Sequence, residues 1–405
     1  MDMIYYSIKS VFYKIAAIFS LILCMLFVFS FSSQAEEQTQ EDAPTVIVIM
    51  NESFFDPSIL GNLSVNEDYL PFYHSLKEYT GKESDNIVKG TLHVSDIGGN
   101  STNTEFEFLT GNSMAFLSPT LSPYSNYLNP ESEYLPKLFN KSGYHTVAVY
   151  PYKGSSWNRN LAYSLMDFSE IYFQDDFDSP KMIRNYISDL TVYQKILQIC
   201  DESSQPVFAF CSTIQNHSGY QKSYSNFPSS IQAIESSNDS LNQYLSLLKE
   251  SDKALEYLIH RIAKSDKETM VVFFGNHQPN DYVVNTICET STPLPSSYMS
   301  PDIRYTVPYF IWANFDLSGY EMADTSPSLL GNTILNAVGV ELDDFQKFLT
   351  ELKSIIPAIS SQGYMDKNGS FHAFSTSLDS TVSQEEILAI HRYHNLINST
   401  LDSTN

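Results

Sequence analysis

The sequence of 405 residues predicts an α/β protein, a three-layer sandwich in which a mostly parallel central sheet lies between two layers of helices. Two observations predict this fold class. Continuous apolar runs rich in β-branched and aromatic residues recur along the chain, and such runs are typical of strands buried on both faces. Segments with helical spacing of apolar residues lie between the runs, and this alternation favours parallel strands connected through helices.

Five apolar runs are expected to form the strands. The first, "PTVIVIM", is almost wholly β-branched, and the others are rich in valine or aromatic residues. The five runs cover residues 44–50, 144–152, 206–213, 269–276 and 305–315. A segment directly before the fourth run, residues 241–264, has apolar residues at helical spacing and is predicted to be a helix.

The chain is expected to contain one large α/β domain with an appendage at each end. Residues 36–43, "EEQTQEDA", have the composition of a linker, so the domain is expected to begin at residue 44 and to continue to residue 342. The polar segment 343–405 is predicted to be helical and to pack at the periphery of the domain.

Residues 1–35 are predicted to be a signal peptide or a single membrane anchor that forms one N-terminal hydrophobic helix. Lys9 and Lys14 precede an apolar run over residues 15–31, and acidic residues follow it. This arrangement of charge predicts that the rest of the chain lies outside the cytoplasm. We favour an uncleaved anchor in the cell membrane, whereas cleavage after Ala35 would make the protein secreted.

Composition excludes some classes of function. The formal net charge is −24, so nucleic acid is a poor partner, because phosphate binding requires a basic surface. None of the four cysteines forms a C-x-x-C pair, so a thiolate zinc site or a redox motif is not expected. Free, buried thiols are the favoured state of these cysteines.

Polar side chains follow four of the predicted strands, at the edge where α/β sheets bind their ligands. Glu52 follows the first strand, "KGSSWNR" (residues 153–159) follows the second, His217 follows the third, and Asn276 and His277 follow the fourth. A carboxylate, an imidazole and an amide oxygen can together bind one divalent cation. A metal bound to a hydroxyl would make that hydroxyl a nucleophile.

The segment "GGNSTNTEFEFLTG", residues 98–111, could supply the hydroxyl. Its glycines allow the backbone to approach a bound anion, and a following helix would direct its N-terminus at a phosphate. Ser101, Thr102 and Thr104 are the alternatives for the nucleophile. The pattern of residues does not by itself select one of the three.

Several motifs in order along the chain resemble those of the lipoteichoic acid synthase family. These motifs are "VIVIMNESF", "GGNSTNTEFEFLTGNSM", "SSWNR", "NHSGY", "FFGNHQP" and "VPYFIWANFDL", and they cover most of the chain after residue 44. The members are sulfatase-like phosphoglycerol transferases of the alkaline phosphatase superfamily. The resemblance implies a catalytic domain with an alkaline phosphatase or sulfatase-like fold at residues 44–342.

The resemblance also implies a reaction and its components. A hydroxyl in the Gly-Gly loop attacks the phosphate of phosphatidylglycerol, and a polymer or glycan of a Gram-positive-type envelope then accepts the glycerophosphate. Register against "NTEF" places the nucleophile at Ser101, with Thr102 as the alternative. The implied Mn²⁺ ligands are Glu52, Ser101, Asn276 and His277, and these ligand types also allow Zn²⁺ or Mg²⁺. The residues implied to contact substrate are Tyr150, Trp157, Arg159 and His217, of which His217 also has a proton-transfer role.

Three residues depart from the family pattern. Serine replaces threonine at Ser101, Asn276 stands where relatives have aspartate, and Tyr150 stands where many relatives have histidine. An amide oxygen binds a hard cation more weakly than a carboxylate does. A catalytically impaired envelope protein that binds polymers is therefore one alternative function.

Other enzymes of the same superfamily are further alternatives. Transfer to water would make the protein a phosphodiesterase, and a phosphoethanolamine transferase would share the fold and the hydroxyl nucleophile. A true sulfatase is disfavoured, because "TNTE" follows Ser101 without the proline and arginine that formylglycine formation requires.

Overall fold

The computed structural model describes residues 43–78, 86–234, 238–291, 300–320, 323–374 and 382–402. The chain divides into two compact units, Met1–Ala43 and Pro44–Asn405. The predicted anchor or signal peptide and all but the last residue of the predicted linker lie outside the described residues. Within the described part, no helix combines the length and the apolar character needed to cross a membrane.

The large unit is built on a seven-stranded sheet with the order β2-β9-β8-β1-β7-β3-β4. β1 pairs in parallel with β7 and β8, and β3 pairs in parallel with β7 and β4, whereas β9 is antiparallel to both β8 and β2. The prediction of a mostly parallel sheet is thus confirmed. The strands are β1 (Thr45–Asn51), β2 (Ile87–His93), β3 (His145–Val149), β4 (Glu170–Tyr172), β7 (Val207–Ser212), β8 (Thr269–Gly275) and β9 (Thr306–Ala313).

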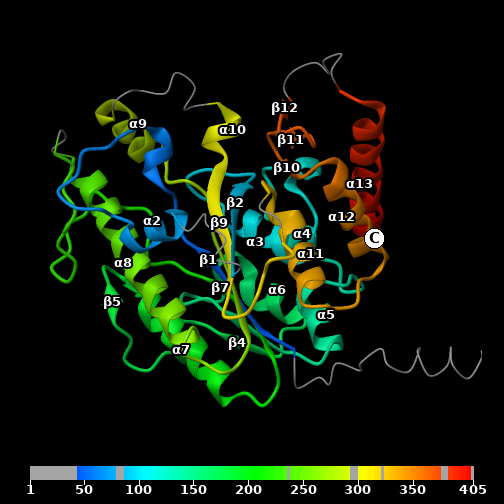
Figure 1. Ribbon diagram of the computed structural model, residues 1–405, viewed down its shortest axis with the longest axis horizontal. Helices are drawn as coiled ribbons and strands as arrows, with labels where there is room; N and C mark the ends of the chain where they lie inside the picture. Colours follow the sequence, from blue (N-terminus) through cyan, green and yellow to red (C-terminus); the bar gives the residue numbers. More distant parts are fainter. Residues whose placement is uncertain are drawn as a thin grey trace, which may run out of the picture. The chain divides into compact units, whose positions relative to one another are not determined.

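Helices cover both faces of this sheet, as Figure 1 shows. The helices are α2 (Pro71–Glu78), α3 (Ser101–Thr110), α4 (Pro123–Asn126), α5 (Leu135–Lys141), α6 (Arg159–Leu165), α7 (Asp189–Glu202), α8 (Asp239–Ile262), α9 (Asp281–Thr290), α10 (Pro301–Arg304), α11 (Pro327–Ala337), α12 (Asp344–Ile355) and α13 (Gln384–Asp402). Short 3₁₀ helices are η2 (Pro57–Leu60), η3 (Met114–Phe116), η4 (Ser156–Asn158) and η5 (Gln174–Asp176).

The alternating side chains of the central strands explain the three layers. On one face, Ile47 and Ile49 of β1 belong to a core cluster that includes apolar residues of α2, α7, α8 and α9. On the other face, the Phe108 ring of α3 lies 5.7 Å from Phe210 of β7 and 5.3 Å from Phe274 of β8. Because both faces of the central strands β1, β7 and β8 are buried, the sheet is stable only with helices on both sides.

Two strands differ from the sequence-based expectation. β2 was not predicted, because Lys89, Gly90, Thr91 and His93 interrupt its apolar pattern. This pattern suits its position at the edge of the sheet, where one side of the strand has no neighbouring strand. β9 occupies the predicted run but is antiparallel, so its N-terminal end lies at the edge where the parallel strands end.

The C-terminal segment after residue 342 has a richer structure than the predicted helices. Besides α12 and α13 it forms an antiparallel sheet of β10 (Ala358–Ser360), β11 (Gly363–Met365) and β12 (Phe371–Ala373). It belongs to the same compact unit as the sheet and has its own apolar cluster, which Leu329 of α11 joins. The hydroxyl of Tyr393 donates to the carbonyl of Gly111, just after α3, at 2.5 Å.

A two-stranded hairpin, β5 (Met182–Ile183) and β6 (Tyr186–Ile187), completes the described strands. The cysteines that the structure describes, Cys200, Cys211 and Cys288, are free thiols. Cys211 and Cys288 are buried and Cys200 is half-buried, as the favoured interpretation expected.

Candidate active site

The fold brings together the residues that follow β1 and β8. These strands are parallel and adjacent, and Asn51 is paired with Gly275 at their ends. Glu52 and Asn276, the next residue of each strand, therefore lie side by side. Helix α3 begins at Ser101 and reaches the same edge, because the hydroxyl of Thr104 donates to the backbone carbonyl of Asn276 at 2.7 Å.

The turn before α3 sets the position of Ser101. Gly98 has a φ of +66°, and a Cβ there would lie 2.9 Å from the Cα of Asn280. Asn100, which caps the helix, is also left-handed, with a φ of 57°. The glycine is required because a larger residue would be both strained and crowded. The two left-handed residues turn the chain so that the Ser101 side chain faces Glu52.

The Ser101 hydroxyl lies between a carboxylate and an imidazole. Its Oγ donates to Oε2 of Glu52 at 3.0 Å and lies 3.4 Å from Nε2 of His277. Nε2 of His277 is 3.7 Å from Oε1 of Glu52. Nδ1 of His277 donates to the backbone carbonyl of Gln278 at 2.9 Å, so the proton is on Nδ1 and the lone pair of Nε2 faces Ser101.

The other two candidate hydroxyls have different surroundings. Thr104 is engaged with the Asn276 carbonyl, as described above. The Thr102 hydroxyl is buried and has no hydrogen-bond partner among the described residues. Of the three, Ser101 is thus the hydroxyl that contacts Glu52 and His277.

Glu52 is buried and is held in its ionised form. Burial by itself raises the pKa of this carboxyl, but the nearby His277 and His217 side chains and hydrogen bonds from Asn276 and Ser101 outweigh it and lower the pKa below its ordinary value. Its oxygens accept from three neutral donors, Ser101, Asn276 and Ser53. The negative charge of Glu52 therefore has no permanent cationic partner among these donors.

Asn276 does not direct its amide oxygen toward Ser101 and Glu52. Its Oδ1 accepts from the backbone N–H of Ser53 at 2.8 Å. Because a backbone N–H can only donate, the atom that faces it is the amide oxygen and not the amide nitrogen. Its Nδ2 consequently donates to Oε2 of Glu52 at 2.7 Å. In this geometry Asn276 orients Glu52 through Nδ2, and its Oδ1 is engaged by the backbone N–H of Ser53. Its role as a metal ligand stays a prediction.

The remaining donors fit a divalent cation. Carboxylate, hydroxyl and imidazole ligands bind such ions at about 2.0–2.2 Å, which requires the ligand atoms to be roughly 3.0–3.6 Å apart. The distances from Oγ of Ser101 to Glu52 and to His277, 3.0 and 3.4 Å, meet this requirement, and the 3.7 Å between Glu52 and His277 slightly exceeds it. Across the described residues there is no group of three or more His, Cys, Asp or Glu side chains that could hold a metal, so a cation at this position would need the serine as its third ligand.

Arg159 forms a buried ion pair with Glu105 of α3. Its Nε and Nη2 donate to the two carboxylate oxygens at 2.8–3.2 Å. The guanidinium carbon lies 3.9 Å from the centroid of the Tyr150 ring. Nη1 of Arg159 is buried and has no hydrogen-bond partner among the described residues. Arg159 thus has a structural partner and retains one donor for a ligand.

Trp157 is half exposed immediately before Arg159. It has a φ of 56° and Asn158 has a φ of 58°, so two consecutive residues are left-handed. A bulky residue in this region is strained, and such strain is concentrated at functional sites. The strain positions an exposed aromatic face beside α6, as substrate contact requires.

His217 is exposed after β7 and is not hydrogen-bonded to Ser101, Glu52 or His277. Its Nδ1 lies 3.3 Å from the hydroxyl of Tyr186, and its backbone carbonyl accepts from Nη2 of Arg184 at 2.6 Å. The charge of His217 nevertheless lowers the pKa of Glu52, so the imidazole acts on the same electrostatic environment.

Sequence reasoning missed Arg184 and Ser53. Arg184 is buried with a φ of 55° in the β5–β6 turn, and its guanidinium donates to the carbonyls of both Gln215 and His217. An arginine in a polar turn has the sequence signature of an exposed residue, so no local signal identifies it. The ion pair of Glu105 with Arg159 was not predicted either, because it joins residues 54 positions apart.

Comparison with known proteins identifies the family to which the chain belongs. The family description "Sulfatase" matches residues 44–340. The chain belongs to the sulfatase family. Its solved structural neighbours include the phosphoglycerol transferase GacH of Streptococcus pyogenes, in complex with sn-glycerol-1-phosphate. The two structures superpose with a TM-score of 0.65 at 22% sequence identity, and the match covers 89% of this chain and 86% of that one.

A second neighbour of this sulfatase-family chain is the lipoteichoic acid synthase LtaP of Listeria monocytogenes, with a TM-score of 0.61, 16% identity, and coverage of 90% and 93%. These structures share the fold, which confirms the resemblance that the sequence motifs indicated. Among curated proteins, a putative cyclic beta-1,2-glucan modification protein of Rhizobium meliloti (strain 1021) is 28% identical over 345 residues, 82% of this chain and 51% of the relative. The chain thus spans about half the length of that relative.

Proposed function

We propose that this protein is a metal-dependent phosphoglycerol transferase that moves glycerophosphate from phosphatidylglycerol to a hydroxyl of an envelope polymer or glycan. The observation that carries the proposal is the Ser101 hydroxyl, which donates to the ionised carboxylate of Glu52 and faces Nε2 of His277. The fold shared with GacH and LtaP, which are described as a phosphoglycerol transferase and a lipoteichoic acid synthase, supports the choice of reaction.

In the first step, Oγ of Ser101 attacks the phosphorus of the donor. The Oγ–P bond forms, the bond from phosphorus to the glyceride oxygen breaks, and diacylglycerol leaves. Glu52 accepts the hydrogen bond of the Ser101 hydroxyl at 3.0 Å and is placed to take its proton. His217 supplies a proton to the departing oxygen.

In the second step, an acceptor hydroxyl attacks the same phosphorus. The new P–O bond forms and the Oγ–P bond breaks, so Ser101 is released. His217 takes the proton of the acceptor, and Glu52 returns its proton to Oγ, which leaves both residues in their starting states. Water in place of the acceptor would give phosphodiesterase activity.

Glu52, Ser101 and His277 are the residues that would hold the divalent cation, with Mn²⁺ as the proposed ion and Zn²⁺ or Mg²⁺ also compatible with these ligand types. When bound, the cation lowers the pKa of the Ser101 hydroxyl and offsets the charge of the phosphate. His277 is ready for this role, because its Nδ1 proton is committed to Gln278 and its Nε2 is free to coordinate.

Arg159, Trp157 and Tyr150 are proposed to bind the glycerophosphate. Nη1 of Arg159 can donate to a phosphate oxygen without loss of the bonds to Glu105. Tyr150 stacks on the guanidinium and limits its movement. Trp157 offers an exposed face against which the glycerol can pack.

We further propose that the domain works outside the cytoplasm and is tethered to the cell membrane by the N-terminal segment. The lysines before the apolar run at 15–31 and the acids after it support this topology. The lipid donor would then be present in the same membrane as the enzyme.

Mass spectrometry of the intact protein after exposure to phosphatidylglycerol tests the proposal. A glycerophosphoryl adduct is expected on Ser101, and Ser101→Ala should abolish it. Thr102→Val is the matched control, because it removes a neighbouring buried hydroxyl that has no described partner. An adduct that persists in Ser101→Ala would refute the assignment of the nucleophile.

A non-catalytic protein that binds envelope polymers is the second candidate. The orientation of Asn276 favours it, because the amide gives no oxygen to a cation in the observed geometry. Purified protein without stoichiometric metal and without an adduct, but with polymer binding, would establish this candidate over the enzyme.

A further inference from the structure

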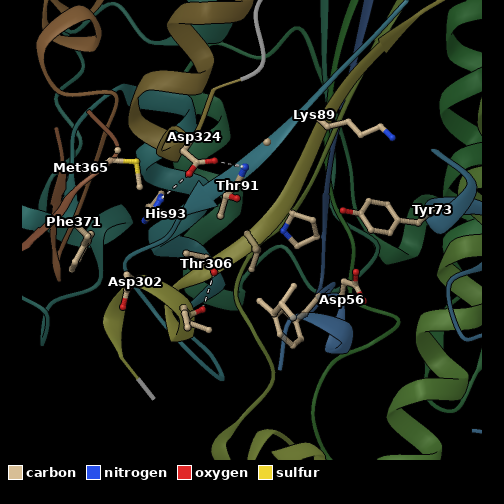
Figure 2. A pocket seen from close by; sticks show the side chains of 17 residues that line it. Asp56, Tyr73, Lys89, Thr91, His93, Asp302, Thr306, Asp324, Met365 and Phe371 are labelled. Carbon is tan, nitrogen blue, oxygen red and sulfur yellow. Dashed lines mark hydrogen bonds and ion pairs between the residues drawn. The ribbon is translucent and has the colours of Figure 1, made fainter. Parts of the chain in front are cut away.

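A cavity of about 700 Å³ lies beside the candidate site, within the size range of small-molecule sites. Its walls come from the edge strands β2 and β9, the segment after β1, α2, α10 and the C-terminal sheet. Figure 2 shows Phe371 and Met365 on one side of the cavity and Tyr73 and Asp56 on the other. The proposed mechanism does not use any of these residues.

The cavity is physically connected to the elements that hold Ser101 and His277. Thr306, which lines it, accepts through its backbone carbonyl from Nε2 of Gln278, the residue after His277. The backbone N–H of Gly98, in the turn before Ser101, donates to the carbonyl of the same Gln278. Asp56 follows Glu52 by only four positions. A ligand in the cavity would therefore contact segments that position the reaction centre.

The charge of the cavity excludes an anionic ligand. Three carboxylates line it, from Asp56, Asp302 and Asp324, against the single ammonium of Lys89, so the formal charge is 1 − 3 = −2 with His93 neutral. Burial by itself raises the pKa of Asp324, but the His93 side chain 4.0 Å away and a hydrogen bond from the backbone of Thr91 outweigh it and lower the pKa. A polyglycerophosphate chain would meet net repulsion here.

The chemistry of the lining also excludes a purely apolar ligand. An acyl chain that filled the cavity would cover the carboxylates of Asp302 and Asp324 without offering them hydrogen-bond donors, which is costly. Aromatic rings nevertheless line the same space, including those of Phe55, Tyr73 and Phe371. A ligand that has both C–H faces for the rings and hydroxyl donors for the carboxylates satisfies both sets of groups.

Sugars have this combination of C–H faces and hydroxyl donors. We propose that the cavity is the subsite for a neutral glycan acceptor, which packs on Phe371 and donates hydroxyl hydrogen bonds to Asp302 and Asp324. This inference rests on the proposed transferase and deepens it, because it selects an uncharged glycan over a growing polyglycerophosphate chain. The acceptor hydroxyl that reaches the phosphorus belongs to a sugar unit held next to the catalytic cluster.

Calorimetric titration of the full chain tests the binding without any need for activity. The probes are neutral β-1,2-, β-1,3- and β-1,4-linked glucan oligosaccharides, cyclic β-1,2-glucan, and a glycerophosphate oligomer as the anionic probe. At least one neutral glucan is expected to bind, and Phe371→Ala and Asp302→Asn are each expected to weaken that binding by about tenfold or more. The glycerophosphate oligomer is not expected to bind in the cavity.

Two matched controls separate the cavity from general damage. Phe374→Ala removes an exposed phenylalanine one position beyond β12 that does not line the cavity, and Asp344→Asn changes an exposed acid in the first turn of α12. Neither should alter glucan binding. The proposal is overturned if no neutral glucan binds, if the controls weaken binding as much as the cavity variants, or if the anionic probe competes for the same site.

A second measurement distinguishes failure of the subsite from failure of the transferase. With phosphatidylglycerol as donor, Phe371→Ala and Asp302→Asn should form the Ser101 adduct at the wild-type rate, but they should pass it to water rather than to the glucan. Glucan binding without any adduct would refute the transferase and leave the subsite intact. An adduct whose partition between glucan and water is unchanged by the cavity variants would refute the subsite alone.

Discussion

Glu52 and Glu105 are both buried carboxylates close to the proposed reaction centre, and the protein stabilises them in opposite ways. Glu52 accepts hydrogen bonds from three neutral donors, Ser101, Asn276 and Ser53. Glu105 receives a bidentate guanidinium from Arg159 and the hydroxyls of Tyr124 and Tyr163. Glu105 therefore has its charge neutralised within the fold, whereas Glu52 keeps a negative charge that a proton or a cation can use.

This difference separates a structural carboxylate from the one proposed to be reactive within the same small region. A buried charge without a permanent partner destabilises the folded state, and proteins retain such charges mainly at functional sites. The protein holds Glu52 ionised with hydrogen bonds and nearby imidazoles, and these do not block access to its oxygens. The four predictions that follow each test one side of this contrast.

The largest effect is expected from Glu52→Gln. The variant should form the Ser101 adduct about 10²–10⁴-fold more slowly, because it loses the acceptor of the serine proton. Its free energy of unfolding should change far less than that of a Glu105→Gln variant, since the substitution leaves no buried cation unpaired. Rates of adduct formation and urea unfolding curves of the same preparation measure the two effects, and a wild-type rate would show that Glu52 is not reactive.

Glu105→Gln is expected to have the opposite profile, with loss of stability as the primary effect. It leaves the Arg159 guanidinium buried without a carboxylate, which should reduce the free energy of unfolding by about 3–5 kcal/mol. Glu133→Gln is the matched control, because the Glu133–Lys141 pair is on the surface and should contribute less than about 1 kcal/mol. Equal losses in the two variants would contradict the structural role of Glu105.

Asn276→Asp would place a second carboxylate beside Glu52, and a bound cation would then be needed to offset the two negative charges. The new carboxylate oxygen would replace the amide nitrogen that now lies 2.7 Å from Oε2 of Glu52, so two like charges would face each other. The metal-free variant should be less stable than wild type by about 2 kcal/mol. Mn²⁺ should restore its melting temperature and should bind more tightly than to wild type; a variant indifferent to Mn²⁺ would argue against a metal at this position.

Glu107 provides a third case for the comparison, with an effect on stability that depends on pH. It is buried two residues beyond Glu105 without a cationic partner, and burial raises the pKa of its carboxyl to about 8. Its Oε1 accepts from Ser95, Ser113 and the backbone of Met114, while Oε2 has no partner among the described residues.

Between pH 4.5 and about 8 the folded protein binds this proton more tightly than the unfolded chain does. The stability that Glu107 contributes is complete below pH 4.5 and is lost as the pH rises toward 8, by at most about 1.4 kcal/mol per pH unit. Melting temperatures of wild type and Glu107→Gln across this range measure the effect. A constant difference between the two would show that Glu107 does not titrate there.

The residues of the site were more predictable from the sequence than their interactions. Unbroken apolar runs identify buried strands in the sequence. Glu52, Asn276 and His277 could therefore be placed at strand ends without a structure. The orientation of the Asn276 amide depends on the N–H of Ser53, a contact across 223 positions that no local pattern encodes. The Glu105–Arg159 pair escaped prediction for the same reason.

The edge of the sheet was less predictable than its centre. β2 is a strand because it pairs with β9, and its polar residues line the cavity rather than disrupting a core. The short strands β10–β12 of the C-terminal segment likewise derive their stability from one another and from neighbouring segments, so their local sequence carries little signal.

The contact between Tyr393 and Gly111 has a consequence for biosynthesis. It joins α3, the helix that begins with Ser101, to a helix 282 positions later. During synthesis the chain emerges from its N-terminus, so α3 lacks this contact until residue 393 has been made. Ser101 therefore reaches its final setting only after the central sheet and α13 have been synthesised.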